Sequence, residues 1–140
     1  MKVCVDTNVL LQARAATHPF GVILDAFVFG QMQWAVSNSI VQEYREIITN
    51  RCGQVAWDAL FQLLENLETR GVLEQAVPHY QFQIVVNDPD DNKFTDCAIT
   101  VHADYLITSD RHFKQLANAG YKPQPITPEA FIERYRGVYV

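Results

Sequence analysis

The chain has 140 residues, of which 49% are hydrophobic and 19% charged, and its formal net charge is −5 at pH 7. This length suits one domain with a true hydrophobic core, so we expect a single domain spanning residues 1–140. The negative charge argues against a broadly basic nucleic-acid binder, yet it is compatible with a nuclease that concentrates acids in a metal site.

Short and long apolar segments alternate along the chain without internal repeats. Short segments predict strands at residues 2–6, 34–36, 72–73, 84–86, 104–108 and 126. Segments with helical spacing predict helices at residues 20–29, 39–51, 55–67, 88–102 and 111–118, and a last helix beginning at Thr127-Pro128. This alternation is typical of an α/β protein with a central parallel sheet and helices on both of its faces.

Sequence signals also place the starts and the buried faces of two helices. Ser39 and Gln42 have the spacing of a capping box, which predicts Ser39 as the N-cap of the helix at 39–51. The apolar stripe expected for the helix at 55–67 consists of Val55, Ala59, Leu60, Leu63, Leu64 and Leu67.

The remaining composition excludes several other classes of protein. No apolar segment approaches the roughly 20 residues of a membrane span, and the opening segment reaches Asp6 too early for a signal peptide. We therefore expect a cytoplasmic protein. Cys4, Cys52 and Cys97 are scattered and lack a CxxC spacing, which predicts buried reduced thiols rather than disulfides or zinc ligands.

Acidic residues stand at the ends of the predicted elements. Asp6 closes the first strand, and Asp110 follows the strand at 104–108. Because the carboxyl ends of parallel strands meet at one edge of a sheet, these acids are expected to share a crevice. Glu43 lies one turn into a helix, and Asp91 opens another. Clustered carboxylates repel one another unless cations separate them, and Mg²⁺ prefers oxygen ligands, so the pattern predicts a metal site.

Helical periodicity ranks the acids within each helix. Glu43 lies at the border of the apolar stripe of its helix, whereas Glu46 points away from it. In the later helix, Asp90 and Asp91 fall near the N-terminal extension of the stripe. Asp96 is nearly opposite that stripe and is expected to face solvent.

Four segments carry an ordered pattern that spans nearly the whole chain: Val-Asp-Thr-Asn-Val-Leu at 5–10, Glu-Tyr-Arg at 43–45, Asp-Pro-Asp-Asp-Asn-Lys-Phe at 88–94 and Ala-Asp-Tyr-Leu-Ile-Thr-Ser-Asp at 103–110. The pattern resembles the PIN-domain ribonucleases, in the branch of the VapC-like toxins. The resemblance implies a three-layer α/β/α sandwich with a central parallel sheet. It also implies Mg²⁺- or Mn²⁺-dependent cleavage of RNA phosphodiester bonds, a homodimer, and an antitoxin protein as partner.

The family motif maps onto Asp6, Glu43, Asp91 and Asp110, with Asp90 and Asp96 as alternatives for the third acid. We expect Asp6 to be the central metal ligand, Asp91 and Asp110 the flanking ligands, and Glu43 a ligand directly or through water. The polar residues expected to orient them are Asn8, Thr108 and Ser109. The cationic residues expected to contact an RNA backbone are Arg45, Lys93, Arg111 and Lys114.

Two other classes of function compete with a ribonuclease. A single Asp at a helix start is often a cap, so Asp91 alone is weak evidence for a site. A phosphotransfer enzyme on a similar sheet would use Asp6 as nucleophile, but Asn8 stands where the Asp-x-Asp pattern requires a second acid. A PIN-like module that binds RNA or protein without catalysis would not need intact acids at all four positions.

Overall fold

The computed structural model describes residues 1–15, 17–77, 92–113, 117 and 123–139 of the chain. The central sheet has the strand order β3-β2-β1-β4-β5, and every neighbouring pair is parallel. The strands are β1 (Lys2–Val5), β2 (Gln33–Val36), β3 (Leu73–Gln75), β4 (Tyr105–Ile107) and β5 (Gln124–Ile126). The predicted parallel sheet is therefore confirmed, and the strand expected at 84–86 lies outside the described residues.

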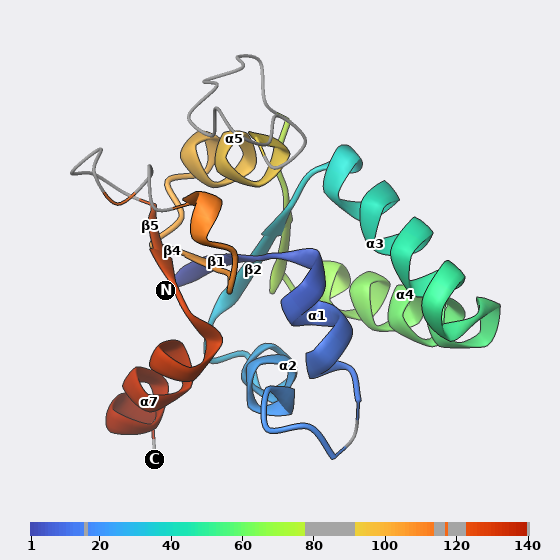
Figure 1. Ribbon diagram of the computed structural model, residues 1–140, viewed down its shortest axis with the longest axis horizontal. Coiled ribbons are helices and arrows are strands. Elements are labelled where there is room, and N and C mark those ends of the chain that lie inside the picture. Colours follow the sequence, from blue (N-terminus) through green and yellow to red (C-terminus); the bar gives the residue numbers. More distant parts are fainter. Residues whose placement is uncertain (16, 78–91, 114–116, 118–122, 140) are drawn as a thin grey trace.

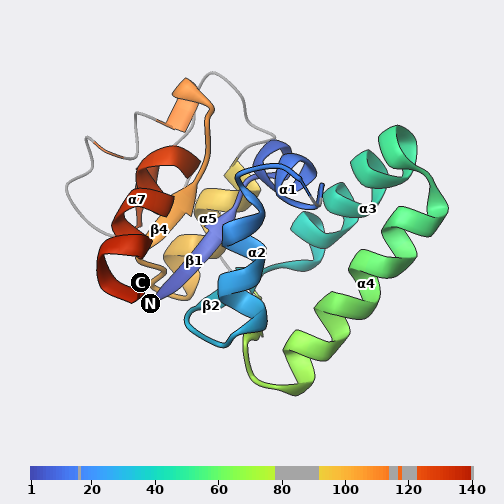
Figure 2. The same ribbon diagram turned by 90° about the horizontal axis from the view of Figure 1, so that it is seen from below.

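Helices cover both faces of this sheet, which confirms the α/β/α sandwich. The helices are α1 (Thr7–Ala13), α2 (Gly21–Val28), α3 (Asn38–Cys52), α4 (Gln54–Thr69), α5 (Asn92–Thr100) and α7 (Pro128–Tyr139), with a short 3-10 helix, η2 (Arg111–Phe113). Figure 1 shows α5 on one face of the sheet and α1 with α2 on the other. Helices α3 and α4 pack together beside the sheet (Figure 2). In the described part of the chain, no helix is long and apolar enough to cross a membrane.

The structure corrects the predicted start of α3. Its N-cap is Ser37, whose hydroxyl accepts a hydrogen bond from the Ile40 amide at 3.4 Å, and Ser39 already lies inside the helix. Ser37 has extended backbone angles because it directly follows β2, and this conformation suits an N-cap. At the other end, α3 stops at Cys52, close to the predicted end near residue 51. Gly53, with a φ of +94°, separates α3 from α4.

Two further predictions about helices differ from the structure. Helix α1 was not predicted, and the segment expected to form a helix at 111–118 begins as the short η2, with residue 117 helical among the other described residues. In α4, Val55 is 82% exposed, and Trp57 is buried in its place beside Leu60 and Leu64. The α4 stripe is therefore anchored by an indole, which covers more apolar area than Val55 would.

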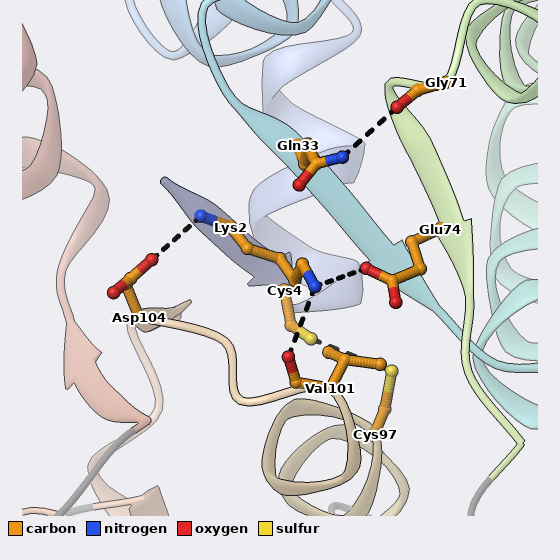
Figure 3. Close-up of polar contacts among 8 residues, drawn as sticks. All are labelled: Lys2, Cys4, Gln33, Gly71, Glu74, Cys97, Val101 and Asp104. Carbon is orange, nitrogen blue, oxygen red and sulfur yellow. Dashed lines mark hydrogen bonds and ion pairs between the residues drawn. The ribbon is translucent and has the colours of Figure 1, made fainter.

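The face of the sheet beneath α5 holds two of the three thiols. Cys4 of β1 and Cys97 of α5 are fully buried, with their sulfur atoms 3.8 Å apart, and both are free (Figure 3). The hydrogen bond to Cys97, together with burial, raises the pKa of the Cys4 thiol. The prediction of buried reduced thiols is thus confirmed for these two, while Cys52 is half-buried.

Lys2 fixes the N-terminal end of β1, which is the end opposite Asp6. Its ammonium group pairs with Glu74 of β3 at 2.5 Å and donates to the Val101 carbonyl at 3.3 Å (Figure 3). Its backbone amide donates to the Asp104 carboxylate at 3.0 Å. These contacts fix β1 between its neighbours and leave the positive charge of Lys2 at the edge of the sheet away from the predicted site.

Candidate active site

Asp6 lies where β1 ends and α1 begins, and its carboxylate is almost entirely buried, with 6% of the residue exposed. It occupies the N-cap position of α1, yet its side chain makes no capping hydrogen bond to that helix. Instead, its Oδ2 accepts a hydrogen bond from the Thr108 hydroxyl at 2.7 Å. The carboxylate is therefore turned toward the loop after β4, where the next acid stands.

Burial raises the pKa of Asp6 to about 6, against an ordinary value of 3.8. The hydroxyl of Thr108 and the neighbouring backbone amide of Thr7 oppose this rise in pKa, whereas the negative charges of Asp110 and Glu43 add to it. The three acids are therefore electrostatically coupled, as expected for carboxylates that share one edge of the sheet.

Thr108 links Asp6 to Asp110. Its buried hydroxyl donates to Asp6 and accepts a hydrogen bond from the Asp110 amide at 3.0 Å. The Asp110 carboxylate accepts from the His112 amide at 2.9 Å and lies 3.4 Å from the His112 imidazole Nδ1. The predicted orienting role of Thr108 thus has direct structural support, whereas Asn8 and Ser109, predicted for the same role, are exposed.

Glu43 approaches the same region from α3. One carboxylate oxygen accepts a hydrogen bond from the Thr7 hydroxyl, and the other pairs with the Lys93 ammonium group of α5 at 2.9 Å. The residue is half-buried while Glu46 is exposed, which confirms the orientations that helical periodicity predicts for these two side chains. Because Thr7 follows Asp6 directly, its hydroxyl also connects the α3 acid to the end of β1.

The predictions for Asp90, Asp91 and Asp96, the candidates for the third acid, have different outcomes. Asp90 and Asp91 lie outside the described residues. Asp96 was expected to face solvent, but it is 8% exposed and stands within a continuously buried run from Phe94 to Ala98. The reason is that α5 packs against the sheet on one side and contacts α3 on another, so more than one of its faces is covered. Periodicity alone therefore does not rank Asp91 above Asp96.

The predicted cationic residues are dispersed around the acids. Lys93 pairs with Glu43, while Arg45 and Arg111 are exposed. Arg45 lines a hollow of about 250 Å³ on the outer side of α3, together with polar residues that include Glu46. Lys114 lies outside the described residues.

The donors at this edge suit a hard divalent cation, because Asp6, Glu43 and Asp110 offer carboxylate oxygens and their mutual repulsion would be relieved by positive charge. Among the described residues, no group of three or more acid, histidine or cysteine side chains is close enough to hold a metal ion. The fourth predicted ligand, Asp91, is outside those residues. The chemistry of the carboxylate oxygens therefore suits a divalent cation, although the described acids alone do not form a site that would hold one.

Sequence reasoning missed two hydroxyl groups that hold this arrangement. The first is that of Thr7, which donates to Glu43. The second is that of Tyr44, which donates to the Val5 carbonyl just before Asp6. Thr7 directly follows Asp6, and Tyr44 directly follows Glu43. This position beside a predicted acid was the feature of the sequence that could have identified them.

Comparisons with known proteins agree with this geometry. A family model described as PIN domain matches residues 2–112. Among solved structures, the chain is similar to the crystal structure of VapC20 from Mycobacterium tuberculosis, described as a sarcin-ricin loop cleaving toxin, with a TM-score of 0.56 and 15% identity. The similarity covers 85% of this chain and 95% of that one, and at this identity it concerns the fold. No curated protein matches the sequence significantly.

Proposed function

The chain belongs to the PIN-domain family, and we propose that it is a metal-dependent endoribonuclease that acts as the toxin of a toxin–antitoxin pair. The observation that carries this proposal is the buried carboxylate of Asp6, coupled to Glu43 and Asp110 at the carboxyl edge of a parallel sheet. An acid whose pKa is raised by burial and by other acids is typical of a functional site.

In this proposal Asp6, Glu43, Asp91 and Asp110 hold Mg²⁺ or Mn²⁺. When bound, such an ion lowers the pKa of a water molecule and stabilises charge on the phosphate and the leaving oxygen. The chain supplies the orientation: Thr108 directs the Asp6 carboxylate, and Thr7 directs that of Glu43. With a pKa of about 6, Asp6 is mostly ionised at pH 7 and is ready to bind a cation.

RNA is the proposed substrate, since the structurally similar VapC20 is described as a toxin that cleaves the sarcin-ricin loop. Lys93 is the cationic side chain placed beside the acids, and its ammonium group could neutralise a phosphate next to the scissile bond. The exposed Arg45 and Arg111 would contact the backbone farther along the strand.

Cleavage of RNA by the purified protein in Mg²⁺, in Mn²⁺ and in EDTA tests this function. Wild type should cleave only with the divalent ion, and Asp6→Asn, Asp91→Asn and Asp110→Asn should lose activity while keeping the fold. The matched control is Asp25→Asn, the same chemical change on the exposed side of α2, which should stay active. Cleavage in EDTA, or an active Asp6→Asn variant, would contradict the assignment. Ion-independent RNA binding without cleavage would instead favour the silent binding module.

Exposed apolar side chains support the proposed homodimer. Phe29, at the end of α2, is 71% exposed, and Val55 and Phe61 of α4 are 82% and 43% exposed. We propose that these side chains lie in the dimer interface, because apolar groups that are exposed in one subunit can be buried between two. Light scattering at micromolar concentration should give a dimer, and Phe61→Glu should weaken it. A wild-type monomer under these conditions would remove the dimer from the proposal.

The proposed antitoxin would block the site by placing a basic side chain, such as the planar guanidinium of arginine, among Asp6 and Asp110. Expression of the wild-type chain alone in cells should then arrest growth, whereas Asp6→Asn should not. Unaffected growth with the wild type would count against the toxin and leave the nuclease to the cleavage assay.

A further inference from the structure

Tyr44 is a fully buried residue of α3 that stands next to the site acid Glu43. Its hydroxyl donates a hydrogen bond to the backbone carbonyl of Val5, the residue before Asp6. One side chain therefore connects the helix that carries Glu43 to the strand that ends in Asp6. The two partners of this bond are 39 positions apart in the sequence.

The peptide group between Val5 and Asp6 is held on both of its sides. Its carbonyl accepts from Tyr44, and its amide donates to the Ile107 carbonyl of β4 at 3.0 Å. The register of β1 with β4 continues to Val5, whereas its register with β2 extends only to Val3. The phenol thus holds the end of β1 on the side where the ladder with β2 has already stopped.

The ring of Tyr44 is itself fixed by aromatic neighbours. Its centroid lies 6.0 Å from that of Trp34 and 6.4 Å from that of Phe94. Phe94 follows Lys93, which pairs with Glu43, so two consecutive residues of α3 meet two consecutive residues of α5. In a close-packed interior this arrangement leaves the phenol little freedom to move.

From these contacts we propose that Tyr44 is a positioning residue, which fixes the Val5–Asp6 peptide and thereby the placement of Asp6 relative to Glu43. Its catalytic consequence rests on the proposed function, but its effect on the backbone does not. Reacting groups that shift by about 1 Å can lose on the order of a hundredfold in rate, so a single hydroxyl at this junction can matter for catalysis without touching substrate.

The experiment compares Tyr44→Phe with Ile48→Val. Tyr44→Phe keeps the ring and removes the hydroxyl, while Ile48→Val removes one methyl group from a fully buried residue one turn farther along α3. Both variants should lower the melting temperature by a few degrees, because one loses a buried hydrogen bond and the other loses packing. The pair therefore separates positioning from general destabilisation.

Three measurements should then change more in Tyr44→Phe than in Ile48→Val, which carries only the general loss of stability. Hydrogen exchange of the Asp6 amide, followed by NMR, should accelerate about tenfold, because the peptide is no longer held on its carbonyl side. Binding of Mn²⁺, measured by calorimetry, should weaken about threefold or more. In the cleavage assay kcat should fall by about ten- to a hundredfold, with KM changed less than about twofold.

Equal exchange of the Asp6 amide in the two variants would overturn the proposal, as would equal Mn²⁺ affinity and kcat. If the wild-type protein cleaves no RNA with any divalent ion, the proposed function fails. The exchange of the Asp6 amide would in that case still decide whether Tyr44 fixes this peptide, because it requires neither metal nor substrate.

Discussion

Replacing Asp6 by Asn should stabilise the folded protein at neutral and alkaline pH when divalent ions are absent. Burial raises the pKa of Asp6 from 3.8 to about 6, a difference that corresponds to about 3 kcal/mol between its protonated and ionised forms. The residue is 6% exposed, so screening by solvent reduces this figure little. The ionised carboxylate thus destabilises the folded wild-type protein, and a neutral amide of similar shape does not.

The sign of the pH dependence follows from the raised pKa. Below about pH 4 Asp6 is protonated in both the folded and the unfolded chain, so its burial carries no charge penalty. As the pH rises from about 4 to about 6, the unfolded chain releases its proton while the folded chain still holds it, so the free energy of unfolding falls by up to about 3 kcal/mol. Above that pH the penalty is constant, and the advantage of Asp6→Asn is complete.

Thermal unfolding followed by circular dichroism in EDTA at pH 4, 6 and 8 measures this effect. Carboxylates far from Asp6 contribute equally in both proteins, so the difference between the two melting temperatures reports on Asp6 together with its coupling to Asp110 and Glu43. It should be near zero at pH 4 and reach about 5–10 °C in favour of Asp6→Asn at pH 8. Excess Mg²⁺ should raise the melting temperature of the wild type alone. A variant that melts below the wild type at pH 8 would refute the reasoning.

Four further variants test other contacts of the structure. Ser37→Ala should lower the free energy of unfolding by about 1 kcal/mol, and Ser39→Ala by much less, in urea unfolding, because Ser37 caps α3; the reverse ranking would restore the capping box. Lys93→Met should lower the rate of RNA cleavage but change the free energy of unfolding by less than about 1 kcal/mol, since the ion pair with Glu43 is partly exposed. Unchanged cleavage would remove Lys93 from the site. Asp96→Ala should destabilise by about 1–3 kcal/mol, and a change within about 0.5 kcal/mol would contradict its burial.

The sheet and the acids at strand ends were predictable because they depend on local patterns and one topological rule. Short apolar segments alternating with helical ones specify a parallel sheet, and parallel strands bring the residues after them to one edge. Asp6 and Asp110 meet this condition, and the structure couples them through Thr108. The half-buried position of Glu43 was predictable because α3 has one covered side and one exposed side.

The incorrect predictions arose where tertiary packing decides. Periodicity assumes a helix covered on one face, but α5 is covered on more than one, so Asp96 is buried. The choice between Ser37 and Ser39 as N-cap depends on where β2 ends, which two serines so close together do not reveal. The pair of Lys93 and Glu43 joins residues 50 positions apart, and no local pattern predicts such a contact.

The three acids Asp6, Glu43 and Asp110 differ in how far their partners compensate their negative charge. Glu43 is neutralised by Lys93, and Asp110 lies beside the imidazole of His112. Asp6, the most buried of the three, accepts a hydrogen bond from the Thr108 hydroxyl, which orients the carboxylate without cancelling its charge. Among the described residues, no cationic side chain forms an ion pair with Asp6, and its burial strengthens any attraction of the carboxylate to a cation. A divalent ion or an arginine that enters this edge would gain most at Asp6, so the feature that destabilises the fold is also the one that would draw its ligand.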